Sequence, residues 1–375
     1  MMKKWMILFD VIVLIIAVSA GILFIQNYNR TQSKEEIRIG VIESLSGNAA
    51  YYGDANRKGV ELAKSELQAK YPNLIAEVIH EDSQYTAQGG VAAYRKIKEL
   101  QKIDAVITHA SPVSLAIQPL ANNDRILQMA VSSSARTYSS SNDLSFRTSP
   151  TTDIEAETLA DFLDGRYENL SILYMNNDIG LSIAGSLKAM LKKINSPIVI
   201  VEEESFSLDN TDFRTQLLKI KEKGADVVFV PALASHISLM LRQSKENNIT
   251  VQFVGFRSTE DPQLLKNAGE LAEGVIYSYG FDTSGSEEAN RFSASYEARY
   301  GENPDGYAAE GYEGLRLTVL ALASCNKNIE CAKSYLHNLK DYNSVFGNLS
   351  FDENGDVYYK FFLKTIRNGT FVRYP

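Results

Sequence analysis

The chain has 375 residues, 45% of them hydrophobic, which is enough for two domains with full cores and excludes a small disulfide scaffold. Lys and Arg (38) are outnumbered by Asp and Glu (46), so the formal net charge of −8 argues against a nucleic-acid partner. Its four histidines, His80, His109, His236 and His337, are too far apart in sequence for the local zinc motifs. We therefore expect no metal ion and no cofactor.

The N-terminal region is apolar. Residues 5–25 carry one charge, Asp10, and as a helix rising about 1.5 Å per residue they match a bilayer core of about 30 Å. Lys3 and Lys4 precede this run, and the positive-inside tendency then places the rest of the chain outside the cytoplasm. Residues 1–30 are thus predicted to be a membrane anchor or signal segment, with one transmembrane helix ahead of the folded body.

Cleavage of this segment is left open by the sequence. Residues 18–20 (Val-Ser-Ala) offer a small-residue cleavage site, whereas residues 21–25 continue the apolar run beyond it, which favours an uncleaved anchor. No cysteine is present in or just after the segment, so a lipid-modified cysteine cannot be the tether. Residues 31–36 are predicted to be a short stalk.

The two cysteines, Cys325 and Cys331, are six apart. An exported chain folds in an oxidising compartment, so a disulfide across this short loop is expected. Two free thiols are the alternative.

The body alternates short β-branched runs with longer stretches of helical period, which is typical of parallel α/β sheets. One series comprises strands at 37–42, 76–80 and 105–107 with helices at 57–70 and 87–100. The second comprises strands at 170–174, 198–201, 226–230 and 251–254, a helix at 183–193, and helix starts at Asp153, Asp212 and Asp261. The pattern predicts two sheets.

The C-terminal third adds a strand at 274–279, helices at 287–300 and 308–324, and a hairpin of strands 348–351 and 357–363. The turn at 352–356 has the acidic spacing of a calcium loop. Its glycine, Gly355, is the fourth residue of the turn, whereas a calcium-binding EF-hand loop has its glycine at the sixth position. The sequence therefore favours a plain hairpin turn.

Motifs of catalysis are missing from the sequence: it has no GxxxxGK[ST] phosphate loop, no complete nucleophile elbow and no dinucleotide fingerprint. His109 follows a predicted strand, where α/β sheets place ligands, although a structural histidine is the commoner reading. The acid pair Glu81-Asp82 has the same placement but is expected to cap the next turn. We therefore expect a protein that is not an enzyme.

Residues 39–53, Ile-Gly-Val-Ile-Glu-Ser-Leu-Ser-Gly-Asn-Ala-Ala-Tyr-Tyr-Gly, resemble the opening of type I periplasmic solute-binding proteins of the leucine/isoleucine/valine class. Further stretches resemble this class in the right order across residues 37–375. They are 81–82, 106–111, 132–135, 146–150, 177–180, 211–213, 312–314 and 347–356.

The resemblance implies an α/β fold of two Rossmann-like, parallel-sheet lobes joined by three crossovers, which close on a small solute. Lobe 1 would comprise residues 37–148 plus 281–345, and lobe 2 residues 149–280 plus 346–375. The crossovers would lie near 147–150, 275–281 and 345–347. The implied partners are a small amino acid, amide or organic acid, and an ABC permease.

The family's ligand loops match short hydroxylic residues here, which suit a carboxylate because they let backbone donors approach an anion. Capping of the following helices is the alternative role for these hydroxyls. The expected ligand-binding residues are Tyr52, His109, Ser111, Ser132, Ser133, Ser134, Ala232 and Arg257.

Arg257 departs from the family pattern, because amino-acid-binding members place an acid there for the ligand's amine; Ile179 likewise replaces an aromatic residue. If Arg257 faces the cleft, it repels an α-amino group and favours a carboxylate. It could instead face solvent. Glu310 or Glu43 could supply a compensating acid.

The function implied by the resemblance is that of an extracytoplasmic solute-binding protein of an ABC-type uptake system. The alternative is a membrane-tethered ligand-sensing ectodomain that is not coupled to transport. In both cases the body lies in the periplasm or at the outer face of the cell membrane.

Overall fold

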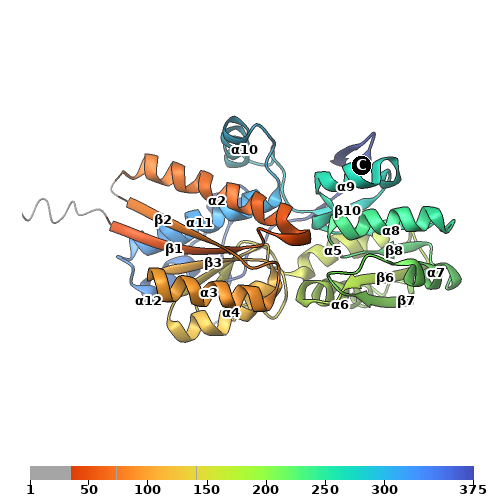
Figure 1. Ribbon diagram of the computed structural model, residues 1–375, viewed down its shortest axis with the longest axis horizontal. Helices are drawn as coiled ribbons and strands as arrows, with labels where there is room; N and C mark the ends of the chain where they lie inside the picture. The colour runs from red at the N-terminus through yellow and green to blue at the C-terminus, as the bar shows by residue number, and fades with distance from the viewer. Residues whose placement is uncertain (1–34, 73, 141) are drawn as a thin grey trace, which may run out of the picture.

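The computed structural model describes residues 35–375 except 73 and 141, and these residues form two α/β lobes that meet along one face each (Figure 1). The predicted transmembrane helix and most of the predicted stalk lie outside the described residues. Within the described part, no helix is both long and apolar enough to cross a bilayer.

Lobe 1 is built on a parallel five-stranded sheet of order β2-β1-β3-β4-β5. β3 and β4 are buried along their whole length, as expected for a parallel sheet covered on both faces. The strands are β1 (Glu35–Glu43), β2 (Leu74–Asp82), β3 (Ala105–His109), β4 (Leu127–Val131) and β5 (Ser145–Arg147).

Helices cover both faces of this sheet. On one face, Ile107 of β3 packs in the same core as Val60 of helix α2 (Ala50–Lys70) and Leu315 of helix α11 (Gly306–Ser324). On the other, Val106 packs with Tyr94 from the helices opposite. The helices are α2 (Ala50–Lys70) and α11 (Gly306–Ser324) on the first face and α3 (Ala87–Gln101) and α4 (Ser111–Asp124) on the second, with α10 (Glu287–Tyr300) and α12 (Ile329–His337) at the periphery.

Lobe 2 contains a seven-stranded sheet of order β14-β13-β10-β9-β8-β6-β7. The strands from β7 to β10 are parallel, but β13 pairs antiparallel with both β10 and β14, so this sheet is mixed rather than purely parallel. A tight turn at Asn368-Gly369, both with positive φ, returns the chain and produces the antiparallel edge.

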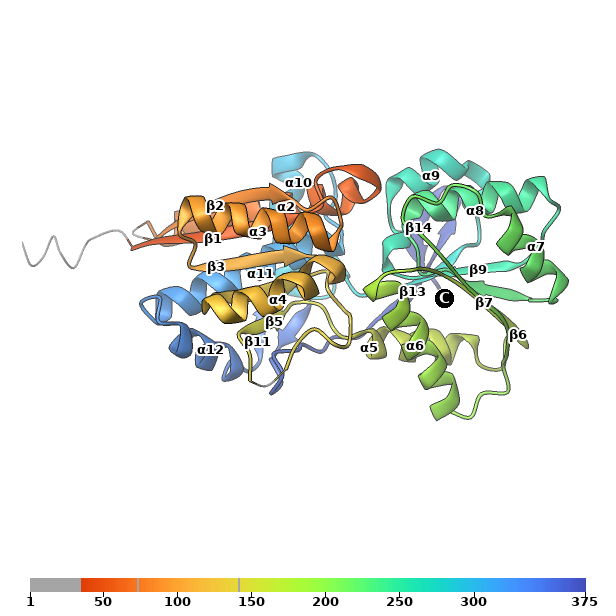
Figure 2. The ribbon, with the colours of Figure 1, turned by 60° about the horizontal axis from the view of Figure 1, so that its bottom comes forward.

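Helices cover the lobe 2 sheet on both sides (Figure 2). The strands are β6 (Asn169–Met175), β7 (Val199–Phe206), β8 (Val227–Phe229), β9 (Gln252–Gly255), β10 (Ile276–Tyr279), β13 (Phe362–Arg367) and β14 (Thr370–Arg373). The helices are α5 (Thr152–Leu163), α6 (Asp178–Lys193), α7 (Arg214–Glu222), α8 (Ala234–Glu246) and α9 (Pro262–Ala268), with 3-10 turns η2 (Arg257–Thr259) and η3 (Gly269–Ala272).

The last crossing between lobes comes later than the predicted position near 346. β12 (Gly347–Leu349) pairs with β11 (Tyr342–Ser344), and Phe351 packs edge-on against Phe146 of lobe 1 at 5.3 Å between ring centroids. The chain therefore stays on lobe 1 beyond 351. Of the predicted second hairpin strand, 357–363, Val357 makes one bridge with Phe351 and residues 362–363 begin β13 in lobe 2, because residues 358–361 connect the lobes.

Cys325 and Cys331 are joined by a disulfide between α11 and α12. Asn328, between them, accepts a hydrogen bond from the Cys331 N–H and so caps the start of α12.

Candidate ligand-binding site

The carboxyl ends of strands from both lobes face each other across the cleft, where α/β sheets place ligands. β3 ends at His109 and β4 at Val131, and in lobe 2 β9 leads directly into η2. A small cavity of about 20 Å³ lies between them, roughly the space of one water molecule. Its lining residues are Tyr52, Tyr85, His109, Ala110, Ser111, Ser132, Ile179, Leu233, Phe256, Arg257, Ser258 and Tyr307.

Tyr52 joins the two lobes. Its hydroxyl donates to the Ser258 carbonyl oxygen at 2.9 Å and accepts from the Ala234 N–H at 3.1 Å, both in lobe 2. The start of α2 that carries Tyr52 packs tightly on the loop after β1, since a Cβ at Gly53 would lie 2.0 Å from the Ser44 carbonyl oxygen. The small cavity is therefore that of a closed cleft.

Arg257 faces the cleft and not solvent, with 7% of its surface exposed. Its Nη1 donates to Glu310 Oε1 at 3.0 Å and its Nη2 to Ser134 Oγ at 2.7 Å, so the guanidinium of lobe 2 binds two lobe 1 side chains. Its backbone N–H donates to Glu155 Oε1 at 3.2 Å. Burial raises the pKa of Glu155, and the nearby Arg257 guanidinium opposes this shift.

Glu310, from α11, is the acid that compensates Arg257. Its Oε2 accepts from Ser132 Oγ at 2.6 Å, and its Oε1 also accepts from the Tyr359 hydroxyl at 2.9 Å. Glu43, the other candidate, contacts His80 Nδ1 at 2.7 Å and is absent from the cavity lining.

The loop that ends at Ser111 and the loop of residues 132–135 contact each other through a hydrogen bond between a side chain and the backbone. Ser111 Oγ accepts from the Ala135 N–H at 3.2 Å, so this hydroxyl links the loops and does not cap α4. Ser132 has a positive φ of 55°. Ser111 and Ser132 line the cavity, whereas Ser133 and Ser134 do not; Ser133 Oγ is buried without a hydrogen-bond partner.

His109 lines the cavity. Its Nδ1 lies 3.3 Å from Ser44 Oγ and its Nε2 is buried without a partner. Burial, with the Arg257 charge as a second cause, lowers the pKa of His109 to about 3, so the imidazole is neutral near neutral pH. Ala232 is buried behind the lining, where its carbonyl oxygen accepts from Ser258 Oγ at 2.6 Å.

Sequence reasoning missed several lining residues, namely Tyr85, Leu233, Phe256, Ser258 and Tyr307. The strand-end rule that indicated His109 could have found Tyr85, which follows β2, and Phe256, which follows β9. No sequence pattern indicated Tyr307, because it lies in the first turn of α11 and not at the end of a strand.

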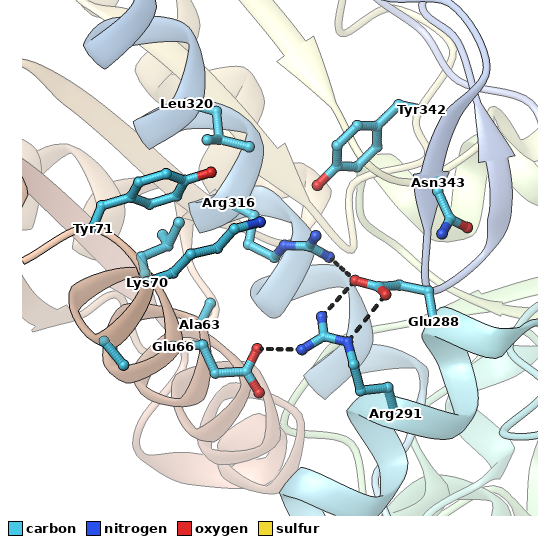
Figure 3. A pocket seen from close by; sticks show the side chains of 12 residues that line it. Ala63, Glu66, Lys70, Tyr71, Glu288, Arg291, Arg316, Leu320, Tyr342 and Asn343 are labelled. Atoms are coloured by element: carbon cyan, nitrogen blue, oxygen red, sulfur yellow. Dashed lines mark hydrogen bonds and ion pairs between the residues drawn. The ribbon is translucent and has the colours of Figure 1, made fainter.

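A larger groove of about 880 Å³ lies on lobe 1 between α2, α10, α11 and β11 (Figure 3). Four of the five charged residues in its lining pair with one another: Arg291 pairs with Glu66 and Glu288, and Arg316 pairs with Glu288, while Lys70 is the fifth. This groove is not at the strand ends, and lobe 2 contributes nothing to its lining. The interlobe cavity is therefore the better candidate for a ligand site.

The fold and the cleft define a two-lobed α/β binding protein whose ligand site lies between the lobes. Residues 36–370 match the periplasmic binding protein family, and the chain belongs to that family.

Known relatives are similar over most of their length. The Leu/Ile/Val-binding protein homolog 2 of Brucella abortus is 24% identical over 331 residues, 86% of this chain and 87% of the relative. A branched-chain amino acid transporter substrate-binding protein from Streptococcus pneumoniae, solved in complex with isoleucine, aligns with a TM-score of 0.82 at 24% identity, covering 90% of this chain and 97% of that one. An ABC transporter solute-binding protein from R. palustris, solved with benzoate, gives a TM-score of 0.81 at 18% identity, covering 90% and 95%.

Proposed function

We propose that this protein is the extracytoplasmic solute-binding component of an ABC-type uptake system and that it binds a carboxylate solute without an α-amino group. The observation that carries the proposal is the position of Arg257 in the cleft. No Asp or Glu is among the described residues that line the cavity, so an ammonium group would find a guanidinium and no carboxylate beside it.

The lining is rich in hydrogen-bond donors. Hydroxyls of Tyr52, Ser111 and Ser132 and the imidazole of His109 surround the cavity together with Arg257. Glu310 and Ser134 engage two of the five guanidinium N–H groups. A carboxylate suits the donors that remain, because charge-assisted N–H···O bonds are about twice as strong as neutral ones.

The mechanism is closure of the two lobes over the solute. A solute that contacts Arg257 on lobe 2 and Ser111 on lobe 1 at once stabilises the closed arrangement over an open one, since an open cleft can offer only one side. Tyr52 adds its two interlobe hydrogen bonds in the same closed arrangement. Closure would be the signal that a permease recognises.

The ligands of the two solved neighbours support a carboxylate solute. The isoleucine and benzoate bound to the two solved neighbours share a carboxylate, and only isoleucine carries an amine. Arg257 in a cavity lining that contains no Asp or Glu among the described residues supports the benzoate type of ligand here.

A thermal-shift screen of the full chain in detergent against benzoate, glutarate and L-isoleucine tests this function. A ligand at 100 times its Kd stabilises the folded protein by about 2.7 kcal/mol. We expect shifts with acids that lack an amine and none with L-isoleucine. A shift with L-isoleucine alone would overturn the proposed ligand class, and Arg257→Gln, which removes the charge, is the matched control.

We further propose that residues 5–25 remain uncleaved and tether the body to the membrane. The support is the length of the apolar run and its continuation past the small-residue site at 18–20. Intact-mass measurement of the protein from its native membrane decides the point, because cleavage after residue 20 would remove the segment.

A further inference from the structure

We infer that Arg147 and Asp356 form a positioning pair that holds the ligand loop, residues 132–135, in its binding conformation. The C-terminal turn at residues 352–356 thereby belongs to the binding apparatus. This inference rests on the proposed function, in which that loop contacts the solute.

The guanidinium of Arg147 binds the backbone of the ligand loop. Arg147 is fully buried at the end of β5, and its Nη1 donates to the carbonyl oxygens of Ser133 at 3.2 Å and Ala135 at 2.7 Å. These two carbonyls flank Ser134, whose hydroxyl accepts from Arg257. One buried cation therefore fixes the backbone on both sides of a residue that meets the other lobe.

The ligand loop needs such support. Ser132 adopts a left-handed φ of 55°, a conformation that is unfavourable for a residue other than glycine. Backbone of this kind persists where its surroundings over-determine it. Here the surroundings are Arg147 on the neighbouring carbonyls and Glu310 on the Ser132 hydroxyl.

Asp356 fixes the Arg147 guanidinium in turn. Arg147 Nε donates to Asp356 Oδ1 at 2.6 Å, and the Ser139 hydroxyl bridges the two, accepting from Arg147 Nη2 at 2.9 Å and donating to Asp356. Asp356 is the acid within salt-bridge distance of this fully buried cation. Without it the guanidinium would be a buried charge with only carbonyl and hydroxyl partners, a costly state.

The turn is built to deliver Asp356 to this point. Asp352 Oδ1 accepts from the N–H groups of Asn354 at 2.8 Å and Asp356 at 2.9 Å, which closes the turn. Gly355 has a φ of +80°, and a Cβ there would lie 2.5 Å from the Ser145 carbonyl oxygen. The Gly355 carbonyl accepts from the Arg147 N–H at 3.1 Å, so the turn docks directly on β5. Its acidic residues thus serve hydrogen bonding within the protein.

The turn also immediately precedes the third crossing between the lobes, at 358–361. Tyr359 in that crossing donates to Glu310, which holds Ser132. Both ends of the ligand loop are therefore linked to the C-terminal segment.

Hydrogen exchange of the full chain tests the inference without any ligand. In Asp356→Ala we expect amides in the peptide covering residues 131–139 to exchange about tenfold faster, although Asp356 is 209 residues from Arg147 in sequence. Asp356→Asn keeps the size and an acceptor oxygen, so it should fold and show a smaller effect in the same peptide. Asp282→Ala, which breaks the exposed Arg373–Asp282 ion pair of the periphery, is the matched control and should leave that peptide unchanged.

Benzoate affinity is the second readout. Asp356→Ala removes a charge-assisted hydrogen bond that fixes Arg147, so we expect it to weaken benzoate binding about tenfold. Unchanged exchange at 131–139 in both Asp356 variants would overturn the inference, as would faster exchange with unaltered benzoate affinity. Failure of the wild-type chain to bind either benzoate or glutarate would contradict the proposed function, whereas the exchange result would still decide whether the turn holds the loop.

Discussion

Arg257 of lobe 2 and Glu310 of lobe 1 form an ion pair of 3.0 Å between Nη1 and Oε1 in the closed cleft, and both side chains are almost fully buried. Glu155, also fully buried, accepts from the Arg257 backbone N–H. Two acids thus contact Arg257 where the lobes meet. This arrangement explains how a guanidinium is tolerated where the resemblance leads one to expect an acid.

Removal of Arg257 alone should both destabilise the protein and abolish carboxylate binding. Arg257→Met leaves Glu310 buried without a cation, and breaking a buried pair in this way costs about 3–5 kcal/mol. The double variant Arg257→Met with Glu310→Gln removes both charges and should regain most of that stability but not the binding. Urea unfolding and calorimetric titration with benzoate measure the two effects. A double variant as unstable as the single one would show that the pair is not the cause.

Loss of the Tyr52 hydroxyl should weaken binding more than folding. Tyr52→Phe removes two hydrogen bonds between the lobes, to Ser258 and Ala234, which hold the cleft closed. Together the two hydrogen bonds stabilise the closed cleft by about 1 kcal/mol or more. Benzoate affinity should therefore fall about five- to tenfold, mainly through faster dissociation. Tyr94→Phe removes a hydrogen bond to Asp124 within lobe 1 and serves as the control. Equal effects of the two variants on affinity would count against a role for Tyr52 in closure.

Stability should fall at alkaline pH because of His80. Burial lowers the pKa of His80, but its contacts with Glu43 and Glu61 outweigh burial and raise the pKa to about 9. The pKa of His80 is higher in the folded protein than in the unfolded chain, where it is about 6.5. Its contribution to the free energy of unfolding is therefore complete below about pH 6.5 and is lost as the pH rises through 9. The loss amounts to about 3 kcal/mol at most.

The measurement is the unfolding free energy across that pH range for the wild type and for His80→Gln. The variant lacks the titrating imidazole, so its profile should be flatter between about pH 6.5 and 9. Parallel profiles for the two proteins would contradict the assignment to His80.

Local sequence signals predicted the regular elements well where one physical cause dominates. The helix at 287–300 was predicted with the boundaries that α10 has, since Ser286 caps its start and Gly301 ends it with a positive φ. The predicted strand at 357–363 was wrong over most of its length, because the interlobe connection there overrides the strand preference of its aromatic and β-branched residues.

The candidate site could be predicted only in part. Strand-end placement indicated His109 and the resemblance indicated Ser111, and both residues line the cavity. The orientation of Arg257 could not be read from the sequence, since it depends on Glu310, 53 residues away on the other lobe. The Arg147–Asp356 pair is still more remote in sequence, and each residue alone is an ordinary charge in a loop or strand.

The Cys325–Cys331 disulfide should stabilise the protein without affecting the cleft. A loop of six residues closed in the unfolded chain corresponds to about 2 kcal/mol in the chain-entropy description. The bond joins α11 to α12 at the end of lobe 1 that faces away from lobe 2 (Figure 1), so we expect benzoate affinity to stay the same. Unfolding of the wild type and of Cys325→Ser with Cys331→Ser, each with and without a reductant, measures the effect. The reductant should lower the stability of the wild type to that of the variant and leave the variant unchanged, whereas equal stability of the two oxidised proteins would contradict the prediction.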